Sequence, residues 1–227
     1  VKTTRFIQVE WRFLLFGMIM AFWSSLGQTF FISLFADDIR AALSLTHGDF
    51  GTYYAIATTL SAISLLWLGK LADTVRLEKL ALLILASLCS GAIFFSQINS
   101  IIMLVLGLYF LRMFGQGMMT HVYSTAMARR YVVARGRAIS IAQLGHTISE
   151  SVGPAGVVAL HALFDWRTIW IILPTTALIL VMPFLRYLTR RTALQDGEGV
   201  DTVPTNNQVK NDSSQIPALD HWRRQDV

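Results

Sequence analysis

The chain has 227 residues, of which 54% are hydrophobic and 15% are charged, and its mean hydropathy is +0.51. An ordinary soluble domain carries about 25% charged residues, and the apolar residues here come in long uninterrupted blocks. The net charge is +5, but the basic residues stand in the turns between these blocks and share no amphipathic face, which argues against a nucleic-acid partner. The composition predicts a polytopic membrane protein.

Six apolar blocks are each long enough, at about 20 residues, to cross the hydrocarbon core of a bilayer. They predict an all-α fold of six transmembrane helices over residues 11–35, 49–68, 80–98, 101–128, 138–163 and 168–188. The first block is too long for a signal peptide and lacks a cleavage-like site, so we expect it to remain as a helix. Thr46 and Asp49 have the spacing of a capping box, which predicts the start of the second helix.

Lysine and arginine are distributed unevenly between the two sides of this predicted bundle. Thirteen of them fall on one side, and only Arg40 and Arg167 fall on the other. Because cytoplasmic loops carry the excess of basic residues, we expect both termini to be cytoplasmic and the protein to lie in the inner (plasma) membrane. Residues 1–191 should form the bundle. Residues 192–227 are polar and are expected to form a disordered cytoplasmic linker or tail.

A short basic turn separates the second and third blocks. It resembles the loop between helices 2 and 3 of major facilitator superfamily transporters, whose pattern is G-x-L-A-D-R-x-G-R-K, through Gly69, Leu71, Ala72 and Asp73. Thr74 stands at the usual basic position of that pattern, and Arg76 stands at its second glycine. The resemblance implies a six-helix half of a transporter, built from 3+3 inverted repeats and followed by a central linker. It also implies that this turn, with Arg76, acts at a cytoplasmic gate.

Two further stretches resemble motifs of the same family. Arg112 and Gln116 match the fourth-helix motif R-x-x-x-Q-G, which implies that Arg112 takes part in binding substrate or coupling protons. Residues 153–156, Gly-Pro-Ala-Gly, loosely resemble the fifth-helix Gly-Pro motif of exporters, with a shifted spacing. Leu26-Gly27-Gln28 and Phe114-Gly115-Gln116 stand at similar depths in the first and fourth helices, as an inverted repeat would place them.

Arg112 and Glu150 are two ionisable residues that lie close to the predicted midplane. At about 1.5 Å per residue, each lies roughly 16–18 Å from the start of its own helix, within a core about 30 Å thick. Ionisable groups at this depth are functional candidates by default. We therefore expect the two charges to approach each other, directly or across a water-filled cavity, with Glu150 as the candidate proton carrier. A static ion pair that only joins two helices is the alternative.

Other polar residues share the helical faces of these two groups. Gln116 follows Arg112 by four residues, and Gln143 and His146 precede Glu150 by seven and four residues. The resemblance to the major facilitator superfamily implies that the first helix lines the same cavity, with Ser24, Gln28 and Thr29. His146 has a second interpretation, as a hydrogen-bonded residue between helices. The small and Pro residues of the fourth and fifth helices are expected first of all to allow close helix packing: Gly115, Gly117, Gly153, Pro154 and Gly156.

The sequence thus predicts a secondary transporter, or its amino-terminal half, that moves a small organic solute by alternating access and is coupled to protons. Uptake or exchange of organic anions such as monocarboxylates, export of small amphipathic compounds, and a non-transporting membrane scaffold remain as alternatives. A further alternative is a small intramembrane enzyme that uses His146 and Glu150. The expected partners are a small-molecule substrate, membrane lipids and a second six-helix half or second copy. The sequence shows no motif for a metal or a cofactor, and Cys89 is expected to be a buried small hydrophobe.

Overall fold

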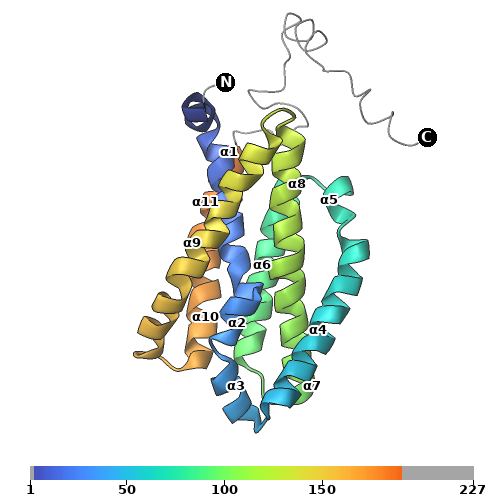
Figure 1. Ribbon diagram of the computed structural model, residues 1–227, viewed down its shortest axis with the longest axis vertical. Coiled ribbons are helices and arrows are strands. Elements are labelled where there is room, and N and C mark those ends of the chain that lie inside the picture. The colour runs from blue at the N-terminus through green and yellow to red at the C-terminus, as the bar shows by residue number, and fades with distance from the viewer. Residues whose placement is uncertain (1–2, 191–227) are drawn as a thin grey trace, which may run out of the picture.

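The computed structural model describes the backbone of residues 3–190 and, within them, all side chains except those of residues 3–5, 73, 74, 77 and 190. The predicted linker, 192–227, lies outside the described residues. Every regular element in the described range is helical (Figure 1). In chain order these elements are α1 (Thr3–Ser24), η1 (Ser25–Gly27), α2 (Thr29–Ser33), α3 (Ala36–Leu43), α4 (His47–Leu68), α5 (Leu71–Thr74), α6 (Leu77–Ser96), α7 (Ile101–Leu111), η2 (Arg112–Met119), α8 (Thr120–Arg130), α9 (Arg135–His161), α10 (Trp166–Thr176), η3 (Ala177–Val181) and α11 (Met182–Arg190).

Five helical stretches in the described part of the chain are long and apolar enough to cross a membrane: Phe6–Ser33, His47–Leu68, Glu78–Ser96, Ile101–Arg130 and Trp166–Thr189. They correspond to five of the six predicted blocks. The other block corresponds to α9, whose 27 residues are also long enough to cross but include Gln143, His146 and Glu150. A sixth span therefore stays a prediction, and so do the repeat arrangement and the orientation of the termini.

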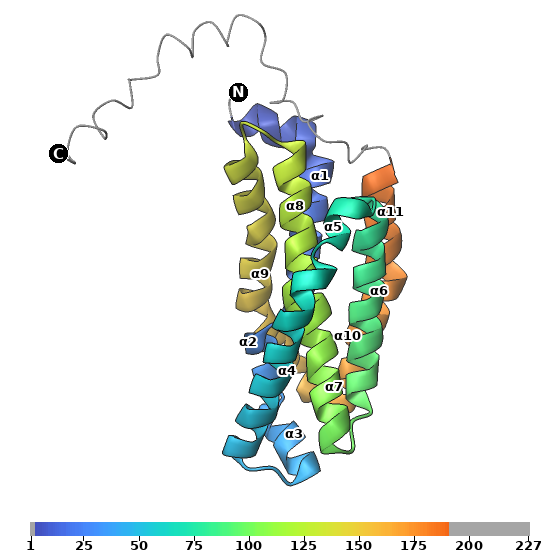
Figure 2. The same ribbon diagram turned by 90° about the vertical axis from the view of Figure 1, so that its right-hand side faces the viewer.

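The helices form one elongated bundle whose two ends differ in charge. The basic end carries the α4–α6 and α8–α9 connections, with Lys70, Arg76, Arg129 and Arg135, while the opposite end carries α3 and the α9–α10 turn (Figure 1). Helix α1 packs along α9 and α8, and α6 packs along α7 and α10. Helix α4 lies at one side of the bundle against α7 and η2, as Figure 2 shows.

Two helix starts follow directly from local sequence. The predicted capping box at α4 is confirmed, because the Thr46 hydroxyl accepts a bond of 3.1 Å from the amide of Asp49, and the Asp49 carboxylate accepts one of 3.0 Å from the amide of Thr46. Asp165 caps α10 in a similar way by accepting from the amides of Arg167 and Thr168. Both devices satisfy amide groups that the first turn of a helix leaves without partners.

The first predicted span, 11–35, corresponds to the stretch Phe6–Ser33, but the helix within it is interrupted. The chain forms α1, then the tight turn η1, and then Gln28 in an extended conformation (φ −84°, ψ 153°) before α2 begins at Thr29. The Ser24 hydroxyl donates to the carbonyl of Ala21 at 2.7 Å, a back-bond that tends to bend helices. Gly27, which follows it, has a low preference for helix. Gly27 also lies in close contact with the fourth helix, because a Cβ built on it would come within 2.0 Å of the Leu111 carbonyl oxygen. Both the local sequence and this contact therefore accompany the break.

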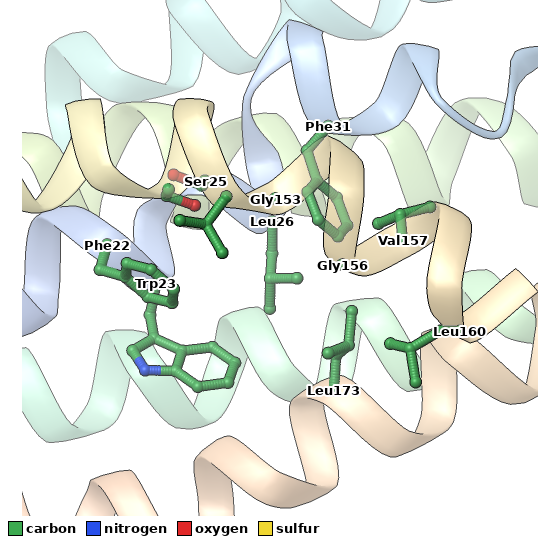
Figure 3. Close-up of a pocket in the computed structure, with 12 residues that line it drawn as sticks. Phe22, Trp23, Ser25, Leu26, Phe31, Gly153, Gly156, Val157, Leu160 and Leu173 are labelled. Atoms are coloured by element: carbon green, nitrogen blue, oxygen red, sulfur yellow. The ribbon is translucent and has the colours of Figure 1, made fainter.

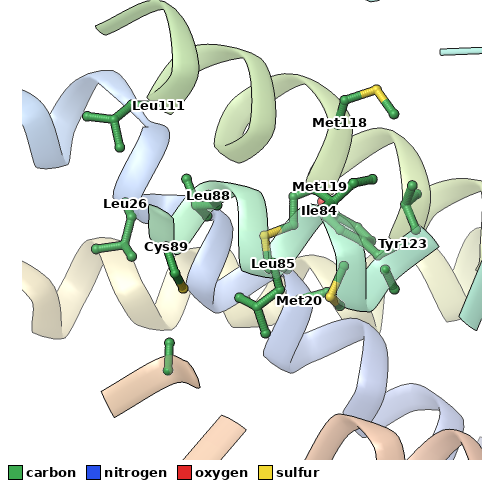
Figure 4. Close-up of a cluster of buried hydrophobic side chains, with 14 of the residues drawn as sticks. Met20, Leu26, Ile84, Leu85, Leu88, Cys89, Leu111, Met118, Met119 and Tyr123 are labelled. Carbon is green, nitrogen blue, oxygen red and sulfur yellow. The ribbon is translucent and has the colours of Figure 1, made fainter. Parts of the chain in front are cut away.

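Apolar side chains from several helices fill the interior of the bundle. Figure 4 shows Met20 from α1, Leu85 and Cys89 from α6, and Met119 from η2 meeting in one cluster. Cys89 is fully buried, which confirms its interpretation as a small buried hydrophobe. At the basic end the core also contains charge. Buried Glu10 accepts bonds from Nε of Arg130 (2.9 Å) and from the hydroxyl of Tyr131 (2.8 Å).

Candidate functional site

The break in the first helix lies directly against an irregular segment of the fourth. Between α7 and α8, residues Arg112–Met119 form the wider π-helical turn η2, a deviation that often marks functional positions. The backbones touch at Gly27 and Gly115, since a Cβ built on Gly27 would lie 2.0 Å from the Leu111 carbonyl oxygen, and one on Gly115 would lie 2.6 Å from Cα of Gly27. The two glycines of the proposed sequence repeat therefore form the contact between the helices.

Arg112 lies at this junction and connects three helices. Its Nη1 donates to the carbonyl of Gly27 (3.4 Å) and to the hydroxyl of Thr29 (3.0 Å), on either side of the break. Its guanidinium carbon lies 5.3 Å from the ring centroid of Tyr54 on α4. The residue is 8% exposed, and its buried Nε has no hydrogen-bond partner in the structure. Among the described residues, every hydrogen-bond and cation–π partner of Arg112 is thus neutral.

Thr29 completes this arrangement with a hydrogen-bond donor. Its oxygen accepts from Arg112 and also from the Tyr54 hydroxyl, at 2.9 Å. A hydroxyl has two acceptor lone pairs and one donor hydrogen, so the Thr29 hydroxyl has only its donor left to offer. The Thr29 side chain is exposed. A cation and a free O–H donor therefore adjoin each other where the helix is broken, an arrangement that suits an oxygen anion.

Glu150 forms a separate polar group on α9. Its Oε1 lies 3.3 Å from Nε2 of His146, and Nδ1 of His146 lies 3.4 Å from the hydroxyl oxygen of Ser25 in η1. A neutral His146 that donates from Nε2 to the carboxylate accepts at Nδ1 from Ser25. The Glu150 side chain is 50% exposed. The predicted direct approach of Arg112 and Glu150 is thus absent in this conformation, because Glu150 pairs with His146 and Arg112 with Thr29, Gly27 and Tyr54.

The other predicted polar residues differ in their exposure and in their hydrogen bonds. Gln116 is exposed, and Gln143, also exposed, accepts a bond from the buried Tyr123 hydroxyl that joins the fourth and fifth helices. Gln28 forms the extended residue of the helix break and is half-buried. Ser24 instead turns into its own helix, where its hydroxyl bonds the Ala21 carbonyl. Ser24 therefore offers nothing to a ligand in this conformation.

Sequence reasoning missed Ser25 and Tyr54. Ser25 stands next to Ser24, and only the tight turn η1 directs its hydroxyl, and not that of Ser24, toward α9. Tyr53 and Tyr54 are likewise neighbours, and the packing of α4 decides which of the two meets Arg112. Their polar, membrane-embedded character was a usable signal, but the choice between neighbours depends on tertiary structure.

The fourth helix also holds the turn at the basic end that resembles the family's loop. His121 Nε2 lies 3.2 Å from the carbonyl oxygen of Gly69, and Nη1 of Arg129 donates to the carbonyl of Ala72 at 3.0 Å. Leu71 and Ala72 lie in α5, as does the backbone of Asp73, whose side chain is outside the described set. Arg76 is exposed and lies 3.6 Å from the Glu78 carboxylate. The turn is therefore attached to the same helix as Arg112.

The small residues proposed for helix packing behave differently from one another. Gly115 is in close backbone contact, while a Cβ built on Gly117 would lie an ordinary 3.4 Å from a methyl carbon of Leu65. A Cβ on Gly153 would find its nearest atom at 3.6 Å, and one on Gly156 would find nothing within 4 Å. Gly156 is therefore not a close packing contact. Pro154 lies between them inside the continuous helix α9.

Comparison with known proteins gives one positive result. The family model described as Major Facilitator Superfamily matches residues 17–219. Members of this family are multi-pass membrane proteins that carry small solutes by secondary transport, in contact with membrane lipids, and are not enzymes. No curated protein and no solved structure shows a significant match to the chain. Since the family match spans most of the sequence and nearly all of the helical bundle, the chain belongs to the major facilitator superfamily.

Proposed function

We propose that this protein is a secondary transporter of a small organic anion, with Arg112 and Thr29 as the groups that bind the anionic oxygens. The observation that carries the proposal is the buried guanidinium, which has only neutral partners among the described residues. Removing a charge from water without a counter-charge costs several kcal/mol. An anionic substrate would supply the missing charge each time it binds, which favours an organic anion as the substrate over a neutral or cationic compound.

We further propose that Glu150 carries the coupled proton. Its half-exposed carboxylate is accessible to solvent and is held by His146, whose other nitrogen faces Ser25 in the broken helix. A proton on Glu150 would remove its charge and weaken the bond from His146, and that bond is connected through Ser25 to η1. Protonation on α9 thereby has a physical connection to the segment that carries Gly27 and Thr29.

The remaining predictions belong to this proposal. The bundle would be one of two six-helix units, the second supplied by a further part of the protein or by a second copy, and the substrate would bind between them near the midplane. Both termini and the basic end would be cytoplasmic, in the inner membrane. The turn containing Gly69, Ala72 and Asp73 would act at the cytoplasmic gate. Arg129 and His121 support this role by attaching the turn to the fourth helix.

Ligand-dependent thermal stability of the purified full-length protein tests the proposal. Small monocarboxylates are compared with the amides of the same compounds, which differ in charge and little in shape. A ligand at about 100 times its Kd stabilises the folded state by about 2.7 kcal/mol, so binding carboxylates should raise Tm and their amides should not. Arg112→Gln should abolish the shift, and Arg112→Lys should keep part of it. Equal shifts with the amides, or an unchanged shift in Arg112→Gln, would contradict the proposal.

A further inference from the structure

A cavity lies on the other side of the broken helix, away from Arg112. It has a volume of about 170 Å³ and lies between helix 1, α9 and α10. Figure 3 shows Trp23, Leu26 and Leu173 among the side chains around it, together with the α9 glycines Gly153 and Gly156. The lining residues are apolar apart from the hydroxyls of two serines, Ser25 and Ser149, and the indole N–H of Trp23. The transport site proposed above uses none of the apolar groups.

The cavity follows from a change of packing along α9. At Gly145 this helix touches α1 so closely that a Cβ would lie 1.9 Å from the Met18 carbonyl oxygen. Two turns later, helix 1 breaks at η1, and Gly153 and Gly156 present no side chain to fill the gap. A Cβ built on Gly156 would have no neighbouring atom within 4 Å. The two glycines and the break together therefore create the space.

This space suits a hydrocarbon guest and not water. A buried water needs two to four polar partners, and apolar cavities of about 150 Å³ stay dry and bind guests the size of benzene. Of the two serines in the lining, Ser25 is already within hydrogen-bond distance of His146. A cavity of about 170 Å³ thus has the size and the chemistry for a short piece of an alkyl chain.

The exposed side of α9 next to the cavity indicates where an alkyl chain that enters the cavity would come from. Val152, which lines the cavity, is 58% exposed and belongs to a stripe with Leu144 (50%) and Ile148 (46%) at spacings of four residues. At 3.6 residues per turn, Val152 lies about 200° around the helix axis from Glu150. The cavity therefore adjoins an exposed aliphatic face, on the side of α9 away from its polar stripe. An aliphatic face turned away from the polar stripe favours contact with lipid when the bundle lies in a membrane.

We propose that this cavity binds part of the hydrocarbon chain of a bilayer lipid, which enters between α9 and α10 and packs against the broken segment of helix 1. The chain would replace the dispersion contacts that the glycines leave unmade. This inference does not depend on the identity of the transported solute. It assigns Gly153 and Gly156 to a lipid site rather than to close helix packing.

Photochemical labelling in membranes tests this assignment. Vesicles that contain the full-length protein and a phosphatidylethanolamine with a photoactivatable group near the end of one acyl chain are irradiated, and labelled peptides are identified by mass spectrometry. Label on residues around Trp23 and Leu173 is measured relative to label on Leu144, which any surrounding lipid reaches. Gly156→Leu places a side chain in the cavity. The acyl chain cannot occupy space that the leucine already fills, so this ratio should fall by about tenfold.

Matched variants separate cavity filling from general effects. Gly51→Leu places the same side chain at another glycine with open space around it and should leave the ratio unchanged. Gly153→Val fills the cavity with a smaller side chain and should act like Gly156→Leu, should the latter fail to fold. An unchanged ratio in the folded filling variants would overturn the proposal. Labelling of the cavity by a small photoactivatable aryl solute but not by the lipid would also overturn it, in favour of a solute site.

Discussion

At the scale of single residues, the chemistry of the proposed site depends on which hydrogen-bond capacities are already used. Thr29 accepts from both Arg112 and Tyr54, and its exposed hydroxyl keeps one donor. Arg112 has no carboxylate partner among the residues that the structure describes. Two donors, one of them charged, are thus held in place before any ligand binds. Such preorganisation lowers the cost of ordering the site around an anion.

Thr29→Val tests the role of the free donor. Valine has nearly the shape of threonine but can neither donate to the anion nor accept from Arg112 and Tyr54. Hydrogen bonds to charged groups contribute about 1.5–3 kcal/mol, so KM for the anion should rise at least about tenfold. Thr29→Ser should keep most of the affinity. Ser33→Ala is the control, because the Ser33 hydroxyl bonds the Phe30 carbonyl of its own helix. If Thr29→Val and Ser33→Ala have equal KM values, Thr29 does not contact the substrate.

Glu150→Gln tests the proton carrier. A glutamine keeps the size and the hydrogen bond to His146 but cannot exchange a proton, so uphill accumulation driven by a pH gradient should stop while exchange of substrate for substrate continues. Both are measured by radiolabelled flux in vesicles. Asp37→Asn removes a carboxylate whose side chain is 91% exposed and should change neither rate. Loss of exchange together with accumulation would indicate a structural role for Glu150.

At the scale of elements, the sequence predicted helices well and their irregularities poorly. Block length and hydropathy located five apolar spans, and the capping box located the start of α4, because both signals are local. The break at η1 and the π-helical turn η2 depend on the contact between Gly27 and Gly115, which joins residues far apart in the chain. The Arg112–Thr29 bond depends on the same contact. Arg112 was recognisable as a functional candidate from its depth and its motif, and Thr29 from its place in the first helix, whereas the hydrogen bond between them was not.

Alanine at either junction glycine should disrupt this contact. In Gly27→Ala the new methyl group would meet backbone atoms of Leu111 and Gly115, which cannot rotate away as a side chain can. Overpacking of this kind costs about 1–3 kcal/mol, so Tm should fall and anion binding should weaken. Gly156→Ala adds the same methyl group to open space and should leave Tm unchanged. Equal Tm values for the two variants would show that the helices separate easily at Gly27.

The buried charge cluster at the basic end should contribute to the stability of the bundle. Glu10→Gln removes the carboxylate to which Arg130 and Tyr131 both donate, and breaking a buried ion pair costs about 3–5 kcal/mol. The variant should therefore unfold at a clearly lower temperature in detergent. Asp37→Asn breaks the exposed pair with Arg40, and surface pairs contribute at most about 1 kcal/mol. Similar losses in the two variants would mean that Glu10 is stabilised by solvent and not by its partners.

At the scale of the whole molecule, the bundle places its polar and apolar functions on different sides of helix 1. Arg112 and Thr29 meet at its contact with α7 and η2, whereas the apolar cavity lies between it, α9 and α10. Ser25 adjoins both α9 features, since it faces His146 and also lines the cavity. A change in the conformation of the break in helix 1 would therefore alter the anion site, the surroundings of Glu150 and the surface next to the cavity together.

Counterflow in proteoliposomes measures the central claim most directly. Vesicles with the full-length protein are loaded with an unlabelled monocarboxylate, and entry of a trace of labelled compound is followed without an ion gradient. The wild type should accumulate label transiently, as should Arg40→Gln, which removes a cation bonded to Asp37 within α3. Arg112→Gln should show none. Counterflow in Arg112→Gln equal to the wild type, or its absence from the wild type with every carboxylate tried, would contradict transport of an organic anion through this site.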